Sequence, residues 1–209
     1  MKWFWTIGCL AVMVVQYLIY QSIKWSSGEH KWQESFFKGA ATAMSALLAG
    51  YGYFSSPDVH RLLILTGLCV CVAADVILDK SFLLGTAAFG LGHICYGASM
   101  LLSQTPGWAN LIVFLSLAAG VMALYPQMKK LANGQSALPY LGYALLIVAM
   151  LSLAITQKPL MMAGALLFVV SDCMLLFLIV KKNRSKKYDY LCLGCYFLAQ
   201  FLIAASTVF

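Results

Sequence analysis

The sequence predicts an all-α integral membrane protein, a bundle of eight transmembrane helices that forms a single domain over residues 1–209. Hydrophobic residues make up 62% of the chain, charged residues only 10%, and the mean hydropathy is +0.85. Soluble globular proteins are about 45 to 50% apolar and about 25% charged. Eight apolar stretches also come close to the length of about 20 residues that crossing a bilayer requires. The chain therefore belongs in a membrane.

The spans follow one another along the chain with short loops between them. The first begins after Lys2 and resembles a signal peptide, but it has no small-x-small cleavage site, so we expect an uncleaved helix. The longest loop, from Lys24 to Ser35, carries Trp25 and Trp32 among charges, which is typical of a segment lying at the lipid headgroups. The third and fourth spans meet at a short charged turn. The eight spans are 3–23, 36–54, 59–78, 81–102, 108–125, 137–156, 159–180 and 188–208.

The positive charges are divided unequally between the two sides of the membrane. Lys24, Lys31, Lys38, Lys80, Lys129, Lys130, Lys181, Lys182, Arg184, Lys186 and Lys187 fall on one side, and Lys2, Arg61 and Lys158 fall on the other. The positive-inside rule makes the first side cytoplasmic and places both termini outside, in the plasma or inner membrane if the host is a bacterium. The net charge of +7 therefore predicts contact with lipid headgroups and no nucleic-acid partner.

Several kinds of chemistry are disfavoured by the sequence. The seven cysteines lie mostly in apolar stretches, and we interpret the Cys192-x-x-Cys195 pair as packing residues rather than a metal or redox site. We expect His93 to be the only membrane-embedded histidine, because His30 falls in a loop and His60 at the edge of the third span, so we predict no metal site. No Gly-x-Ser-x-Gly motif is present. A set of carboxylates, one histidine, tyrosines and a lysine remains, which suits acid–base catalysis without a cofactor.

Two aspartates inside predicted spans are the strongest functional candidates. An ionised Asp near the centre of a bilayer costs about 2.5 to 3.5 kcal/mol, so a chain keeps one there only with a partner or a task. Asp75 falls about one turn, and Asp172 about two turns, from the cytoplasmic ends of the third and seventh spans. His93 lies near the middle of the fourth span. We predict Asp75, Asp172 and His93 to be catalytic.

Other polar side chains fall at a similar depth and are predicted to line a cavity open to the cytoplasmic leaflet, where they would bind substrate. They are Lys38, Asp79, Tyr96, Tyr125, Tyr140, Ser171, Tyr196 and Gln200. Structural alternatives exist: Asp79 as the N-cap of the fourth helix, Lys38 as a side chain extending to the headgroups, and His93 as a core histidine. Gly85, Gly90, Gly92 and Gly97 are expected to permit close helix packing.

The chain also contains two similar short segments. Ala74-Asp75-Val76-Ile77-Leu78 in the third span is similar to Ser171-Asp172-Cys173-Met174-Leu175 in the seventh. These two spans run in the same direction, so a parallel four-plus-four repeat would place the two aspartates in related positions.

Taken together, these motifs resemble the YhhN family, the membrane proteins related to TMEM86 that include lysoplasmalogenases. The motifs are Lys38 opening the second helix, Ala-Asp75 followed by Asp79, Phe82, Leu84 and Gly85, then Gly92-His93-x-x-Tyr96, Phe168-x-x-Ser171-Asp172-x-x-Leu175 and Tyr196-x-x-x-Gln200. The resemblance covers the second to eighth spans. One departure is Ala74, where the family often has Gly.

The resemblance implies hydrolysis of the vinyl-ether bond of lysoplasmalogens, with membrane lipid as surroundings and a lysophospholipid as substrate. Vinyl ethers are cleaved by acid, so the reaction needs a protonated acid and a negative charge that stabilises the cation. We assign the acid to Asp172 and the stabilising carboxylate to Asp75, held ionised by Lys38 or His93, and the reverse assignment stays open. The alternative function is a proton-coupled transporter of a small lipid or amphiphile.

Overall fold

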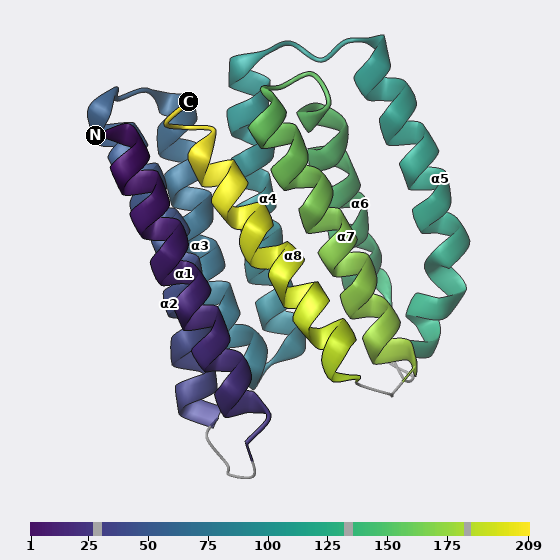
Figure 1. Cartoon of the computed structure of the whole chain (residues 1–209). Coiled ribbons are helices and arrows are strands. Elements are labelled where there is room, and N and C mark those ends of the chain that lie inside the picture. The colour runs from purple at the N-terminus through teal and green to yellow at the C-terminus, as the bar shows by residue number, and fades with distance from the viewer. Residues whose placement is uncertain (27–30, 132–135, 182–184) are drawn as a thin grey trace.

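The structure is a computed structural model that describes residues 1–26, 31–131, 136–181 and 185–209 (Figure 1). Over these ranges it contains eight α-helices and no strand. The helices are α1 (Lys2–Lys24), α2 (Lys31–Ser55), α3 (Val59–Lys80), α4 (Phe82–Ser103), α5 (Trp108–Leu131), α6 (Leu138–Ala154), α7 (Pro159–Lys181) and α8 (Lys186–Ala205). Each predicted span corresponds to one helix, so the all-α prediction is confirmed for the described residues.

Two helix ends depart furthest from the predicted ones. Helix α2 begins at Lys31 rather than at residue 36, because Glu34 in its first turn complements the positive end of the helix dipole. Trp32 therefore lies within α2 and stacks on Phe36 at 5.6 Å, whereas residues 27–30 of the predicted headgroup segment lie outside the described residues. Helix α5 continues through Pro126 to Leu131, although an interior proline removes one backbone hydrogen bond.

Within the described ranges, six helices are long and apolar enough to cross a bilayer: α1, α3, α4, α5, α7 and α8. The molecule is therefore an integral membrane protein. Helix α2 has 25 residues, but the charges of Lys31, Glu34 and Lys38 lower its hydropathy. Helix α6 has 17 residues and is short for a span. The prediction of eight spans is thus supported for six helices, and the other two remain a prediction.

The helices run up and down, so both chain termini lie at one end of the bundle (Figure 1). Along the chain, α1 packs on α2, α2 on α3, α3 on α4 and α7 on α8. Contacts between distant parts of the chain join α2 to α8 and α4 to α6. Helix α5 lies at the outer side of the bundle and packs mainly on α6 (Figure 1). The pairs α2–α8 and α4–α6 bring the polar motifs together.

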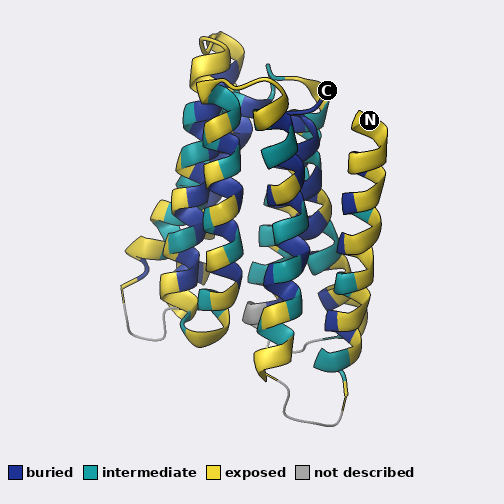
Figure 2. Cartoon of the chain, turned by 90° about the vertical axis from the view of Figure 1, so that its left-hand side faces the viewer, coloured by how far each residue is buried: buried dark blue, intermediate teal, exposed yellow. Residues whose placement is uncertain are grey.

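The buried side chains form a large cluster through the bundle and a smaller one between α5 and α6. Figure 2 shows buried positions on the inward helix faces and many exposed ones on α1 near the N-terminus. The exposed side chains include large apolar ones such as Trp3, Phe4 and Trp108. In a membrane protein, lipid rather than another protein element can cover such residues.

Glycine determines how closely α3 approaches α4. A Cβ atom at Gly92 would lie 2.7 Å from the sulfur of Cys71, and one at Gly67 would lie 2.5 Å from the ring of Tyr96. Gly85 likewise meets Leu78 too closely for a side chain, with a Cβ-to-Cβ separation of 2.7 Å. The predicted role in close packing fits Gly85 and Gly92. It does not fit Gly90 and Gly97, where a Cβ atom would make ordinary contacts at 3.5 and 3.7 Å.

Candidate active site

Asp75 lies in a cluster built from α2, α3 and α8. Its side chain is fully buried because it falls on the same face of α3 as Leu68 and Cys71. Thr42 of α2 and Tyr196 of α8 both donate hydrogen bonds to Oδ2, the second at 2.8 Å. The ammonium group of Lys38 is 3.5 Å from Oδ1. A cation and two hydroxyl donors around one carboxyl group favour its ionised form.

Lys38 also reaches Asp79, one turn further along α3, at 3.6 Å from Oδ1. Ser35 donates a 2.6 Å hydrogen bond to the other oxygen of Asp79. Asp79 is therefore not the N-cap of α4. That position is taken by Ser81, whose hydroxyl accepts from the amide of Leu84 at 3.4 Å, because α3 continues through Asp79 to Lys80. We call Lys38, Thr42, Asp75, Asp79 and Tyr196 the Asp75 cluster.

A second cluster surrounds Asp172 and comes from α4, α6 and α7. The hydroxyl of Tyr143 is 2.7 Å from Oδ2 of Asp172 and 3.5 Å from Nε2 of His93. The other ring nitrogen of His93, Nδ1, is 3.2 Å from the sulfur of Met150. His93 is only 1% exposed, whereas Asp172 and Tyr143 are half-buried. We call His93, Tyr143, Met150 and Asp172 the Asp172 cluster.

The two clusters are joined by aromatic packing. The ring of Phe168 lies 4.5 Å from His93 and 5.5 Å from Tyr196, so one side chain contacts a member of each cluster. Phe89 packs edge-on against both Phe168 and Tyr196. Among the described residues, no hydrogen bond or ion pair links Asp75 directly to Asp172. From the sequence we expected the two aspartates at similar depth. In the structure, the rings of Phe168 and Phe89 lie between the two clusters.

A chain of hydrogen bonds extends from the Asp75 cluster towards His93. Gln200 donates to the hydroxyl of Tyr196 at 3.3 Å, and its amide oxygen accepts from Tyr96 at 2.8 Å. The ring of Tyr96 meets that of His93 edge-on at 6.1 Å. Tyr96 and Gln200 are completely buried. These predicted site residues therefore connect the clusters from within the core.

Three more predicted site residues, unlike Tyr96 and Gln200, neither belong to a cluster nor connect the two. Ser171 donates to the backbone carbonyl of Cys192 at 2.9 Å, which joins α7 to α8. Tyr125 packs in the α5–α6 cluster, with the ammonium group of Lys129 over its ring at 5.0 Å. Tyr140 packs there too and contacts Phe82 at 6.0 Å. The structure gives these residues packing roles.

Thr42, Tyr143, Met150 and Phe168 belong to the site but were not among the predicted site residues. Thr42 is four residues after Lys38, a spacing that places both on one face of α2, so it was accessible to sequence reasoning. Tyr143 lies in the same half of its helix as Tyr140, and only the contact with α7 distinguishes the two. Met150 looks like an ordinary apolar position in the sequence, and Phe168 was noted only as part of the motif around Asp172.

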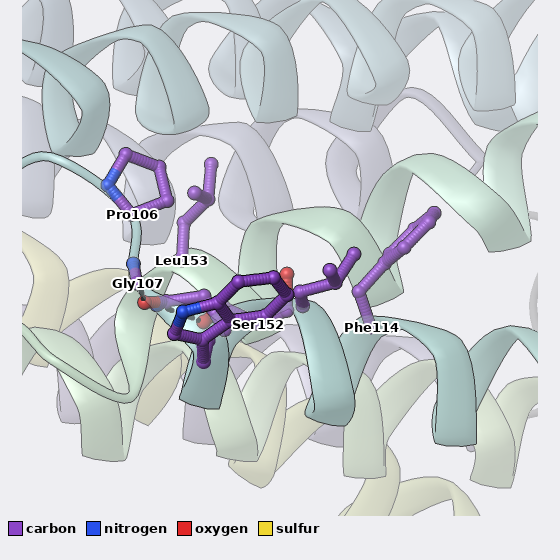
Figure 3. Close-up of a pocket in the computed structure, with 8 residues that line it drawn as sticks. Pro106, Gly107, Phe114, Ser152 and Leu153 are labelled. Atoms are coloured by element: carbon purple, nitrogen blue, oxygen red, sulfur yellow. Dashed lines mark hydrogen bonds between the residues drawn. The ribbon is translucent and has the colours of Figure 1, made fainter.

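The predicted cavity at the cytoplasmic leaflet does not correspond to either cavity seen in the described residues. One cavity of about 440 Å³ is lined by the loop Pro106–Gly107 and by residues of α5 and α6, including Phe114 and Ser152 (Figure 3). The other, of about 340 Å³, is an apolar groove beside α7 and Tyr188. No member of the two clusters lines either one. Nor do three His, Cys, Asp or Glu side chains gather as metal ligands in the described part of the chain.

Comparison with known proteins places both clusters in a matched region. The model of the YhhN family matches residues 33–207, a range that includes every residue of the two clusters and leaves out α1. A curated protein named lysoplasmalogenase TMEM86B, from Homo sapiens, is 33% identical over 150 residues. That alignment covers 67% of this chain and 62% of the human protein. No solved structure matches the chain.

Proposed function

This chain belongs to the YhhN family, and on that premise we propose that it is a lysoplasmalogenase-like hydrolase acting within the membrane. The proposed reaction converts a lysoplasmalogen and one water into a fatty aldehyde and glycerophospho-ethanolamine or -choline. The name of the human relative, a lysoplasmalogenase, supports this proposal. A membrane lysophospholipid also suits a chain with six helices able to cross a bilayer.

The observation that carries the proposal is the contrast between the two buried carboxyl groups. Asp75 is held by the ammonium group of Lys38 and by two hydroxyl donors. Asp172 contacts the neutral hydroxyl of Tyr143, and no cation pairs with it in the described ranges. Such surroundings favour an ionised Asp75 and a protonated Asp172. Two carboxyl groups in different protonation states are what acid-catalysed cleavage of a vinyl ether needs.

In the proposed mechanism, Asp172 is the general acid. Its proton is transferred to the alkenyl carbon that does not bear the ether oxygen, and the electron pair of the double bond forms the new C–H bond. The other alkenyl carbon becomes an oxocarbenium ion. Water adds to that carbon and releases a proton to a carboxylate, giving a hemiacetal. The hydroxyl of the hemiacetal then gives up its proton as the C=O bond forms, the bond to the glycerol oxygen breaks, that oxygen takes up a proton, and the aldehyde is released.

Asp75 supplies the negative charge in this scheme, and Lys38 keeps that charge in place. Lys38 is already shared between two carboxylates, which favours this role over binding the phosphate of the substrate. Because Asp75 is completely buried, it acts on the cation through its field and through Tyr196. Asp172 is half-buried, so substrate approaches it from the side of α6 and α7.

We also propose that all eight helices span the bilayer, that the termini lie outside, and that the site faces the cytoplasmic leaflet. Asp172 is nine residues before the end of α7, about 14 Å along the axis at 1.5 Å per residue. That depth lies within one leaflet of a hydrocarbon core about 30 Å thick. The excess of Lys and Arg at the corresponding loops supports the orientation.

The parallel four-plus-four repeat remains part of the proposal, supported by one more correspondence. Gly67 and Gly164 lie eight residues before Asp75 and Asp172. At each glycine a side chain would collide with the following helix, since a Cβ at Gly67 would be 3.1 Å from Gly92 O and one at Gly164 would be 2.9 Å from Ala199 O. The clusters draw on α2, α3 and α8, and on α6, α7 and α4. The repeat would interchange these two sets.

The test is aldehyde release by the purified protein from a lysoplasmenyl-ethanolamine, beside the acyl lysolipid of the same chain length and with a chelator present. The proposal predicts aldehyde from the vinyl ether only, at a rate that the chelator does not change. Fatty acid released from the acyl lipid would indicate an esterase instead. If the folded protein formed neither product, the hydrolase assignment would be wrong, and proton-coupled transport would be assayed next.

A further inference from the structure

The ring of His93 has different partners at its two nitrogens. Nδ1 faces the sulfur of Met150 at 3.2 Å, and Nε2 faces the hydroxyl of Tyr143 at 3.5 Å. The rings of Phe168 and Tyr96 pack edge-to-face with the imidazole, at 4.5 and 6.1 Å between ring centres. Because His93 is 1% exposed and contacts no carboxylate directly among the described residues, it is a neutral imidazole.

A neutral imidazole has one N–H donor and one acceptor nitrogen, and its surroundings decide which nitrogen carries the proton. The thioether sulfur of Met150 has no hydrogen to donate and can only accept. The nitrogen that faces it, Nδ1, therefore carries the proton. Nε2 is left with its lone pair directed at Tyr143, so the hydroxyl of Tyr143 is the donor in that contact.

The hydrogen bond of Tyr143 also determines the protonation state of Asp172. A tyrosine hydroxyl has a single hydrogen, and in this arrangement it is directed at Nε2 of His93. The oxygen of Tyr143 is also 2.7 Å from Oδ2 of Asp172. That short contact is a hydrogen bond only if the carboxyl group donates. Asp172 must then be protonated.

The opposite arrangement leaves a mismatch. With Asp172 ionised, Tyr143 would donate to the carboxylate and would accept from Nε2–H of His93. Nδ1 would then present its lone pair to the lone pairs of the Met150 sulfur at 3.2 Å, with no hydrogen between them. A buried acceptor without a donor is unfavourable, so the first arrangement is preferred.

We propose that Met150 fixes the Nδ1–H tautomer of His93 and, through Tyr143, holds Asp172 in its protonated form. Met150 and Tyr143 are positioning residues, since neither transfers the proton to substrate. The protonation pattern is a property of the resting protein. Its value for catalysis rests on the proposed function, because a vinyl-ether hydrolase needs a proton on its acid before substrate arrives.

The titratable groups recorded around Asp172 allow this pattern. They are Tyr143 of α6, Cys192 of α8 and Cys173 of its own helix, and His93 of α4 is the next group beyond Tyr143. None of them is a lysine or arginine. No lysine or arginine of the described residues forms an ion pair with Asp172.

Nitrogen-15 NMR of the full chain, labelled at its three histidines and held in detergent, reads the tautomer directly. The resonance that disappears in His93→Gln identifies His93. The proposal predicts a protonated Nδ1 and an unprotonated Nε2 for His93. A protonated Nε2, in either the neutral or the doubly protonated ring, would overturn it.

Substitution of Met150 tests the cause. Met150→Leu keeps the volume and removes the acceptor, so we predict that the proton of His93 moves to Nε2. Met161→Leu is the matched control, since Met161 is equally buried at 2% exposure and belongs to neither cluster. It should leave the His93 resonances unchanged. An unaltered Nδ1–H tautomer in the Met150 variant would show that the sulfur does not set it.

Infrared spectroscopy reports whether Asp172 is protonated. The carbonyl stretch of a protonated carboxyl group should be present in the parent near neutral pH and absent from Asp172→Asn. It should weaken several-fold in Met150→Leu but not in Met161→Leu. These spectra need no substrate, so the protonation pattern can hold even if aldehyde is never formed. If the parent shows no such band, the proposal fails whatever the activity.

Discussion

Lys38 and Asp75 form an ion pair inside the bundle, with Nζ 3.5 Å from Oδ1 and side chains that are 7% and 0% exposed. Among the described residues, no hydrogen-bond donor reaches Oδ1, the oxygen that faces Lys38. Thr42 and Tyr196 both donate to Oδ2. Lys38 is therefore the main group that stabilises the negative charge on Oδ1 of Asp75. Three helices, α2, α3 and α8, converge on this one carboxylate.

Removal of the cation should destabilise the fold strongly. Lys38→Met leaves Asp75 as a buried charge without its counter-ion, and breaking such a pair costs about 3 to 5 kcal/mol. The double variant Lys38→Met with Asp75→Asn should recover most of that loss, because no charge is left unpaired. Thermal unfolding in detergent measures both. Equal losses in the single and double variants would mean that packing of the lysine stem, and not charge, is responsible.

Loss of one hydroxyl donor should have a smaller effect. Tyr196→Phe keeps the ring against Phe168 but removes the 2.8 Å hydrogen bond to Asp75. We expect a loss of about 1 to 3 kcal/mol in stability, the usual cost of a buried group left without a partner. Tyr125→Phe is the control, because that ring packs between α5 and α6, away from either carboxyl group. Similar effects of the two substitutions would contradict the account.

The approach of α3 to α4 predicts opposite outcomes for two glycine substitutions. In Gly67→Ala the new methyl group would lie 2.5 Å from the ring of Tyr96, and such overpacking costs about 1 to 3 kcal/mol. Gly120→Ala on α5 meets nothing within 4 Å and should stabilise its helix by about 0.5 to 1 kcal/mol. Unfolding temperatures that shift in the same direction for both variants would contradict the packing described here.

Much of this fold could be predicted from the sequence because the strongest signals are local. Apolar stretches and charged loops located all eight helices, and Asp75, Asp172 and His93 stood out because polar groups are costly in lipid. Contacts between distant helices were beyond reach. No local pattern shows that Tyr143 lies against Asp172, or that Phe168 separates the two carboxyl groups. The cap of α4 was misassigned because Asp79 and Ser81 are equally good capping residues by type.

The rate of aldehyde release should depend on pH in a definite direction. If Asp172 donates the proton, activity requires its protonated form and falls tenfold per pH unit once the pH exceeds the point at which Asp172 ionises. Met150→Leu favours the ionised form and should move this alkaline fall to lower pH, with kcat reduced several-fold and KM little changed. A pH–rate profile of each variant measures it. A rate that rises with pH throughout would contradict acid catalysis.

The most direct test of the central claim compares the two aspartates in one assay. Purified parent, Asp172→Asn and Asp75→Asn are given a lysoplasmenyl-ethanolamine, and aldehyde is measured after circular dichroism has shown that all three are helical. Asn keeps the shape of the side chain and its hydrogen-bonding capacity but holds no transferable proton. The account predicts aldehyde from the parent, none above background from Asp172→Asn, and a greatly reduced rate from Asp75→Asn. Full activity in a folded Asp172→Asn variant would contradict it.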